Sequence, residues 1–278
     1  MYFILKVAIV LLLLLNLNYT ALAQQKLNTD TSVVYKKVGD LVLKMKVIRP
    51  PSMHDKKSYP CIIFFFGGGW IKGSPEQFRE HANHFAKEGL ICFLVDYRVK
   101  SRQGTTPFES LKDAKSAIRF VRKNADRFHI IKDSIIASGG SAGGQLAAAA
   151  ALIDGYNEST DDLSVSAKPN ALVLFNPVID NGPGGYGFER IGYEYKNFSP
   201  LHNIDKGAPP TIIFLGTNDK LVSVETAQYY KKVMEKTGSR CDLILYPGAE
   251  HGFFNKDIYV EKTLSQADRF LISLRYIR

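Results

Sequence analysis

Cysteine is scarce in this sequence, and its scarcity limits the kinds of protein the chain can be. The 278 residues include three cysteines, Cys61, Cys92 and Cys241. The count is odd, the spacings are wide, and each cysteine falls in an apolar run that predicts a strand. This pattern argues against a disulfide framework and against a cysteine-ligated metal site. We expect buried free thiols, with one disulfide after export as the alternative.

Long apolar runs are also few, and the clearest lies near the N-terminus. Residues 7–15 are unbroken apolar residues that follow the single charge of Lys6. This run is too short for a comfortable membrane span. Residues 21–23, Ala-Leu-Ala, have the small-x-small spacing of a signal-peptidase site. We expect residues 1–23 to be a signal peptide cleaved between Ala23 and Gln24. The mature protein would then be periplasmic or secreted, without stable membrane association; an uncleaved anchor is the alternative.

The charge of the chain lacks any concentrated basic run. The formal net charge is +9 at pH 7, from 36 basic and 27 acidic residues. The basic residues are scattered, and no nucleic-acid-binding motif accompanies them. The charge therefore indicates solubility, with a weak bias toward anionic surfaces or polymers, and does not point to a nucleic-acid partner.

Strand and helix patterns alternate along the rest of the chain. Two alternating apolar–polar segments, 32–38 and 41–48, flank Gly39-Asp40 and predict a β-hairpin. Continuous apolar runs, typical of strands buried on both faces, are found at 61–66, 90–95, 134–137, 171–175, 211–215 and 242–246. Helical patterns occupy 75–88, 108–128, 145–152, 224–236 and 258–274. The alternation predicts an α/β fold with a mostly parallel central sheet, helices on both faces, and the antiparallel hairpin at one edge.

No repeat or low-complexity linker divides residues 24–278, so we expect one domain. Two segments read as insertions. Residues 154–169 are polar, and residues 176–210 are rich in glycine, proline and aromatic residues. The second segment follows a strand, and such a strand end faces the ligand crevice in open α/β sheets. Residues 176–210 are therefore expected to cover a binding site.

Ser141 stands at the centre of a Gly-x-Ser-x-Gly motif between a predicted strand and a predicted helix. A serine on such a sharp turn has a strained backbone and an exposed hydroxyl. Glycines at 139 and 143 avoid collisions that a Cβ would make with the strand and the helix. The helix N-terminus adds partial positive charge and free N–H groups. A plain glycine-rich turn is the alternative, but the strand before and the helix after it favour a nucleophile.

A serine nucleophile needs a base, and the base needs an orienting acid. His251 follows the last predicted strand, flanked by glycine and aromatic residues, whereas the other five histidines lie in polar loops or on helices. Asp219 follows the strand at 211–215 and is the expected acid. Asp180, which also follows a strand, is the rival acid.

Acyl transfer also requires donors for the oxyanion. Gly68 and Gly69 offer backbone N–H groups on a loop that substrate can approach closely, and the N–H of Ala142 supplies another. As a simple turn, three consecutive glycines after a buried strand would be costly in chain entropy, which favours a functional loop.

These motifs carry a family resemblance. They are Gly-Gly-Gly-Trp at 67–70, Asp-Tyr-Arg at 96–98, Gly-Gly-Ser-Ala-Gly-Gly at 139–144, Asp219 and His251. Together they resemble the α/β-hydrolase esterases, especially the hormone-sensitive-lipase-like branch and the secreted acetyl xylan and feruloyl esterases. The family usually has histidine where this chain has Phe66, which favours the carbohydrate-esterase branch. The resemblance extends from about Pro60 to the C-terminus. It implies the α/β-hydrolase fold and an ester hydrolase without metal or organic cofactor.

The expected function is an exported serine esterase that removes short acyl groups, acetyl first, from carbohydrate. Residues 176–210 contain no long aliphatic run that would line a groove for a long acyl chain. Tyr186 and Tyr193 in this segment either stack on sugar rings or bury each other. Trp70 either lines the pocket or packs in the interior. Arg98 is interpreted as a charge that anchors a loop rather than a substrate contact.

Two other functions compete with this one. A serine exopeptidase of the prolyl-oligopeptidase type shares the fold and the triad, but it usually carries a propeller domain for which this chain has no room. A catalytically silent hydrolase-fold binding protein typically lacks a triad member, and all three are present here. Labelling by a fluorophosphonate would separate the silent protein from an enzyme.

Overall fold

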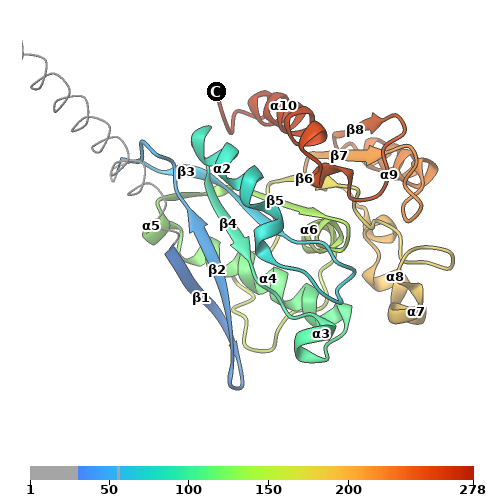
Figure 1. Cartoon of the computed structure of the whole chain (residues 1–278). Helices are drawn as coiled ribbons and strands as arrows, with labels where there is room; N and C mark the ends of the chain where they lie inside the picture. The colour runs from blue at the N-terminus through green and yellow to red at the C-terminus, as the bar shows by residue number, and fades with distance from the viewer. Residues whose placement is uncertain (1–30, 55–56) are drawn as a thin grey trace, which may run out of the picture. The chain divides into compact units, whose positions relative to one another are not determined.

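An eight-stranded sheet runs through residues 31–54 and 57–278, the part of the chain that the computed structural model describes (Figure 1). The strands are β1 (Thr31–Val38), β2 (Leu41–Ile48), β3 (Tyr59–Phe65), β4 (Ile91–Val95), β5 (Ile130–Gly140), β6 (Ala171–Phe175), β7 (Thr211–Gly216) and β8 (Cys241–Tyr246). Their order in the sheet is β1-β2-β4-β3-β5-β6-β7-β8. β2 is antiparallel to β4, and all pairs from β4 to β8 are parallel. The predicted parallel sheet with a hairpin at one edge is confirmed.

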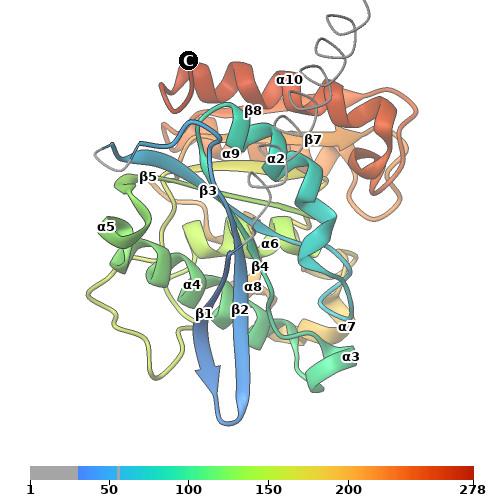
Figure 2. The same cartoon turned by 60° about the vertical axis from the view of Figure 1, so that its left-hand side comes forward.

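Helices cover both faces of this sheet (Figure 2). The longer ones are α2 (Arg79–Lys87), α4 (Pro107–Lys123), α6 (Ala142–Leu152), α9 (Val224–Lys236) and α10 (Asp257–Ser273). α2 and α10 lie on one face, and α4 and α6 lie on the other. Side chains of β3 alternate between the two cores: Ile62 and Phe64 pack with α2, whereas Ile63 and Phe65 pack with α4 and α6. Burial on both faces explains why the strand is apolar throughout.

Two predicted helices are each divided in the structure. The predicted helix at 75–88 begins as a 3₁₀ turn, η1 (Pro75–Phe78), capped by Ser74, and continues as α2. The predicted helix at 108–128 becomes α4 and the short α5 (Ala125–Phe128). The division falls at Asn124, whose side chain donates a hydrogen bond to the carbonyl of Phe120. Asparagine favours such local backbone contacts over helix continuation.

The two predicted insertions have different structures. Residues 154–169 contain turns and no helix or strand. Residues 176–210 contain short helical turns, α7 (Phe188–Ile191), η2 (Gly192–Glu194), α8 (Tyr195–Phe198) and η3 (Pro200–Asn203). The short α3 (Lys100–Gln103) follows β4. All three cysteines are buried and unpaired, as expected. The predicted signal peptide and its cleavage site lie outside the described residues.

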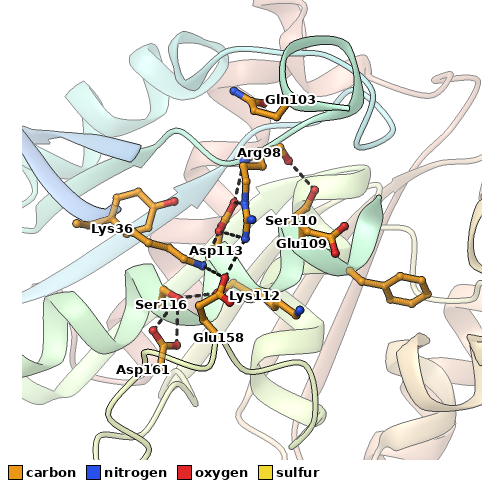
Figure 3. Close-up of polar contacts among 12 residues, drawn as sticks. Lys36, Arg98, Gln103, Glu109, Ser110, Lys112, Asp113, Ser116, Glu158 and Asp161 are labelled. Atoms are coloured by element: carbon orange, nitrogen blue, oxygen red, sulfur yellow. Dashed lines mark hydrogen bonds and ion pairs between the residues drawn. The ribbon is translucent and has the colours of Figure 1, made fainter. Parts of the chain in front are cut away.

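A buried ionic cluster joins the hairpin to the body of the fold (Figure 3). Lys36 on β1 contacts Asp113 on α4 at 2.6 Å and Glu158 at 2.8 Å. Arg98, after β4, contacts the same two carboxylates at 2.8 and 3.0 Å. Two positive and two negative groups therefore compensate one another away from water. Arg98 anchors its loop, as its interpretation from the sequence predicts.

Candidate active site

Ser141 occupies the turn between β5 and α6. Its backbone has φ +53° and ψ −118°, so the residue sits in a left-handed conformation that non-glycine residues rarely adopt. A Cβ added at Gly139 would come within 2.4 Å of the backbone of Gly143, and one at Gly143 would lie 2.0 Å from the carbonyl oxygen of Phe65. Both glycines are therefore required for α6 to pack directly on the sheet. This close packing holds the serine at the end of β5.

His251 and Asp219 complete a chain of hydrogen bonds from Ser141. The Oγ of Ser141 lies 2.8 Å from Nε2 of His251, and Nδ1 of His251 lies 2.8 Å from Oδ2 of Asp219. The other carboxylate oxygen of Asp219 accepts the backbone N–H groups of Leu221 and Val222, at 2.8 and 3.0 Å. The side chain of Asp219 is fully buried. A nucleophile, a base and an orienting acid thus meet at the carboxyl ends of β5, β7 and β8.

Asp180, the rival acid, lies elsewhere. Its carboxylate accepts the N–H of Gly182 at 2.8 Å, and Nδ1 of His202 lies 3.9 Å from it. Of the two candidate acids, Asp219 is the one whose carboxylate contacts the imidazole of His251.

The glycine loop after β3 lies beside Ser141. A Cβ at Gly67 would lie 3.4 Å from Cβ of Ser141, so the loop and the serine are in close contact. The N–H of Gly67 is used by the side chain of Gln77, whose Oε1 accepts it at 2.6 Å. The N–H groups of Gly68 and Gly69 have no acceptor among the described residues. These two donors are free to bind an oxygen atom beside the serine.

Ala142 is the first residue of α6, directly after the serine. A residue at this position has no carbonyl one turn earlier in its own helix, so its N–H is left for another acceptor. The N-terminal end of α6 also adds partial positive charge at the point where an oxyanion would form.

A cavity of about 340 Å³ opens at the serine. Residues from the glycine loop, the three strand ends and the 176–210 segment border it; they include Gly68, Gly69, Ile71, Lys72, Ser141, Asn176, Tyr186, Leu221, His251 and Phe254. Tyr186 therefore borders the cavity, and its role as a substrate contact stays a prediction. The other two aromatic candidates do not border it.

Trp70 and Tyr193 both lie away from the cavity lining. Trp70 is 1% exposed and packs against Tyr186 and Phe198, so the packing interpretation describes it. Tyr193 is 91% exposed and contacts Phe188 edge-on. A loop aromatic gives no sign in the sequence of whether it faces a site, the interior or solvent.

Asn176 is a cavity residue that the sequence analysis missed. It follows β6 with φ +34°, and its Oδ1 accepts the N–H of Gly252 at 3.2 Å. Its Nδ2 lies 3.3 Å from Nε2 of His251. The available sequence signal was its position: like Ser141, Asp219 and His251, it follows a strand of the parallel sheet.

Within residues 31–54 and 57–278, no group of three or more His, Cys, Asp or Glu side chains could hold a metal ion. None of the helices in these same residues has the length and apolar character needed to cross a membrane.

Solved structures of esterases resemble this chain over most of its length. The apo form of esterase 2 from Thermogutta terrifontis is 40% identical, with a TM-score of 0.86 over 91% of this chain and 97% of that one. The propionate-bound form of the esterase from the same species is 39% identical, with a TM-score of 0.85 over 90% and 96% of the two chains.

Family and sequence relatives give the same assignment. Residues 46–183 match the BD-FAE family, and residues 176–271 match the dienelactone hydrolase family. Esterase LipC of Mycobacterium tuberculosis is 27% identical over 71% of this chain and 54% of its own length. The acetylxylan esterase of Xylanibacter ruminicola is 27% identical over 69% of this chain and 41% of its own length. The chain thus spans about half the length of these two relatives. At 40% identity over nearly the whole of a solved esterase, the chain belongs to the esterases of the α/β-hydrolase family.

Proposed function

We propose that this protein is a serine esterase that removes short acyl groups, acetyl first, from acylated saccharides. The observation that carries the proposal is the hydrogen-bonded series Ser141–His251–Asp219 at the mouth of a small cavity. Gly68 and Gly69, whose N–H groups have no acceptor among the described residues, border the same cavity. A nucleophile with its base beside free donors is the arrangement that acyl transfer requires.

The proposed reaction begins with attack of the Ser141 hydroxyl on the ester carbonyl. Nε2 of His251 takes the hydroxyl proton, and Asp219 stabilises the resulting imidazolium and keeps Nδ1 protonated. The N–H groups of Gly68, Gly69 and Ala142 stabilise the negative oxygen of the tetrahedral intermediate.

Collapse of the intermediate breaks the ester bond. His251 returns its proton to the departing alcohol, and the acyl group remains on Ser141. His251 then takes a proton from water as the water oxygen attacks the acyl carbonyl. It returns this proton to Oγ of Ser141 as the acyl–oxygen bond breaks and the acid leaves. Apart from the ester and water, the groups in these steps all belong to this chain.

The size of the cavity supports a short acyl group. A volume of about 340 Å³ lies near the lower end of the roughly 300–1,000 Å³ of typical small-molecule sites. One structural neighbour is described as bound to propionate and another to butyrate. The saccharide part of the proposal is supported by the distant acetylxylan esterase relative and by the expected export of the chain.

The test is acetate release from acetylated xylo-oligosaccharides by the mature protein and by Ser141→Ala. The wild type should release acetate and should be labelled by a fluorophosphonate, and Ser141→Ala should do neither. The fold should persist in the variant, because losing a hydroxyl at a turn leaves no core cavity. Hydrolysis of simple acetyl esters without release from the oligosaccharide would remove the saccharide from the proposal. Activity of Ser141→Ala near the wild-type level would remove Ser141 as nucleophile.

A further inference from the structure

Asn176 contacts both the base and the residue that follows it. Its side-chain Oδ1 accepts the backbone N–H of Gly252 at 3.2 Å, and its Nδ2 lies 3.3 Å from Nε2 of His251. A backbone N–H can only donate, so the amide oxygen faces Gly252 and the NH₂ group faces the imidazole. The contact with the main chain thus determines which end of the amide the histidine meets.

The backbone of Asn176 is fixed next to the nucleophile. Its N–H donates to the carbonyl of Phe214 at 2.7 Å, and the carbonyl of Phe175, just before it, accepts the N–H of Ser141 at 3.0 Å. Its φ of +34° lies in the left-handed region, which asparagine adopts more readily than most other residues with a side chain. The residue is 0% exposed, so bulk water does not compete for its side-chain contacts. Asn176 therefore joins the turn of Ser141 to the loop of His251.

The NH₂ group of Asn176 suits one tautomer of His251. When the ring proton is on Nδ1, Nε2 carries a lone pair that can receive the hydroxyl proton of Ser141, and a neighbouring donor is compatible with that lone pair. When the ring proton is on Nε2, two donors face each other across 3.3 Å. Asp219 favours the first tautomer through Nδ1. Asn176 favours the same tautomer from the opposite ring nitrogen.

The same group affects where the proton goes during the reaction. Once Nε2 has taken the proton of Ser141, the NH₂ group of Asn176 offers that proton no acceptor. The oxygen of the departing alcohol remains as an acceptor, as proton return requires. An aspartate at position 176 has nearly the same shape but would hold the proton on Nε2, because it places a negative acceptor where the NH₂ group lies.

We propose that Asn176 is a positioning residue that directs Nε2 of His251 at Ser141 and keeps that nitrogen free of a proton before substrate is attacked. The inference rests on the proposed esterase function and adds to it the residue that follows β6. It also gives a role to the one cavity residue whose amide contacts the base.

Other titratable groups near His251 stay unchanged when residue 176 is substituted. Within the described part of the chain, Asp219 lies 2.8 Å from Nδ1, and Lys72 and Tyr186 line the same cavity. Glu250, the neighbour in sequence, is exposed to solvent. A change in pH dependence caused by a substitution at position 176 therefore reports the group that faces Nε2.

The experiment compares Asn176→Asp and Asn176→Gly with the wild type. Aspartate keeps the acceptor for the Gly252 N–H but replaces the NH₂ group by a negative oxygen. Glycine removes the side chain and suits a φ of +34°. Two rates are measured between about pH 5 and pH 9: kcat/KM on 4-nitrophenyl acetate and the rate of fluorophosphonate labelling.

Asn170→Asp is the matched control. Asn170 precedes β6, at the opposite end of the strand from residue 176. Its Oδ1 likewise accepts a backbone N–H, from Ile135 at 3.1 Å. The control thus makes the same substitution beside the same strand, away from the imidazole.

In the wild type, both rates should rise with pH as His251 becomes neutral. Asn176→Asp should move this rise upward by about one to three pH units, because a negative group beside Nε2 stabilises the protonated imidazole. Asn176→Gly should leave the rise near its wild-type position and lower the plateau of kcat/KM by about two- to tenfold, the equivalent of one lost hydrogen bond. Asn170→Asp should match the wild type in both respects.

A rise at the wild-type pH in Asn176→Asp would overturn the inference, and so would an equally large shift in Asn170→Asp. If Asn176→Asp does not fold, Asn176→Gly decides, since a wild-type kcat/KM in that variant would show that the amide is not needed. Failure of the proposed function is a separate result: a wild type that is labelled yet hydrolyses no ester. The labelling profile then decides alone, an upward shift in Asn176→Asp supporting the positioning role and an unshifted profile overturning it.

Discussion

The two oxygens of the Asp219 carboxylate have different partners. One faces Nδ1 of His251, and the other accepts the N–H groups of Leu221 and Val222. Rotation of the carboxylate would break several hydrogen bonds at once, so its direction is fixed. A fixed acceptor at Nδ1 keeps the proton on that nitrogen and leaves Nε2 free to receive the proton of Ser141.

Asp219→Asn should therefore lower kcat by about 10³–10⁴, because an amide permits the wrong histidine tautomer. KM and the thermal unfolding temperature should change far less. The matched variant is Asp180→Asn, whose carboxylate lies outside the series and which should retain kcat close to the wild type. Steady-state kinetics on 4-nitrophenyl acetate measures both. A larger loss in Asp180→Asn than in Asp219→Asn would exclude Asp219 as the acid.

Residue positions were predictable where they follow a strand. Ser141, Asp219 and His251 each come just after an apolar run, and parallel strands bring their carboxyl ends to one edge of the sheet. Gln77 gave no such signal, because a lone polar residue in a loop or a short helix has no periodicity. Its partner, the N–H of Gly67, is a backbone group whose orientation only the folded structure defines.

At the scale of the element, α2 carries two histidines with opposite environments. His81 is 2% exposed, packs against Phe78 and Phe254, and has no hydrogen-bond partner for either ring nitrogen among the described residues. Burial lowers the pKa of His81 to about 4, and the charge of His84 adds to the shift. The hydrogen bond to Asp268, on α10, raises the pKa of His84 instead.

The two shifts give opposite pH dependences of stability. His81 is neutral in the folded protein, so its contribution is present above about pH 6.5 and is lost as the pH falls toward 4. His84 contributes below about pH 6.5, and this contribution is lost as the pH rises through its raised pKa. The His81 effect is roughly 3 kcal/mol in full, whereas the partly exposed His84 pair is worth about 0.5 kcal/mol. We therefore expect His81 to determine the pH dependence of the free energy of unfolding more than His84 does.

His81→Leu should therefore reduce the loss of stability in acid. From pH 7 to pH 4.5, the wild type should lose roughly 2–3 kcal/mol more of its free energy of unfolding than the variant does. His84→Gln, on the same helix, should leave that acid-side loss nearly unchanged. Urea unfolding at several pH values measures the difference. Parallel pH profiles for the wild type and His81→Leu would show that His81 does not remain neutral in the folded state.

Element boundaries followed from the sequence where local signals were strong. The predicted strand at 171–175 and helix at 224–236 match β6 and α9 residue for residue. β5 is longer than predicted: Ile130 already pairs with Tyr59 of β3, but the polar Lys132 and Asp133 separate it from the predicted apolar run. The helical turns within 176–210 were missed, since segments of three or four residues are too short to display a helical period.

At the scale of the whole molecule, long-range pairing was beyond sequence reasoning. Arg98 could be interpreted as an anchor from its place after a strand, but its partners Asp113 and Glu158 come from α4 and from an insertion. Lys36, which completes the cluster, lies 77 residues before Asp113. The topology of the sheet could be predicted because strand–helix alternation restricts it to few arrangements.

The cavity sets the expected preference for acyl length. Each buried CH₂ contributes about 0.8 kcal/mol when apolar surface is there to receive it. With about 340 Å³ at the serine, a long chain would extend beyond the cavity and gain little from its added carbons. We expect kcat/KM to be highest for acetyl to butyryl esters and to fall at octanoyl. A panel of 4-nitrophenyl esters measures this series, and a steady rise to octanoyl would favour a lipase instead.

The left-handed backbone of Ser141 has a further consequence, for stability. A non-glycine residue in this region costs about 1–3 kcal/mol, so the fold is weakened at the very residue proposed for the chemistry. Ser141→Gly should raise the free energy of unfolding by about 1 kcal/mol while abolishing hydrolysis, whereas Ser141→Ala should abolish hydrolysis without that gain. Thermal unfolding of the two variants measures the difference. Selection for heat tolerance alone would thus discard the nucleophile, so any programme to stabilise this protein must screen for turnover as well.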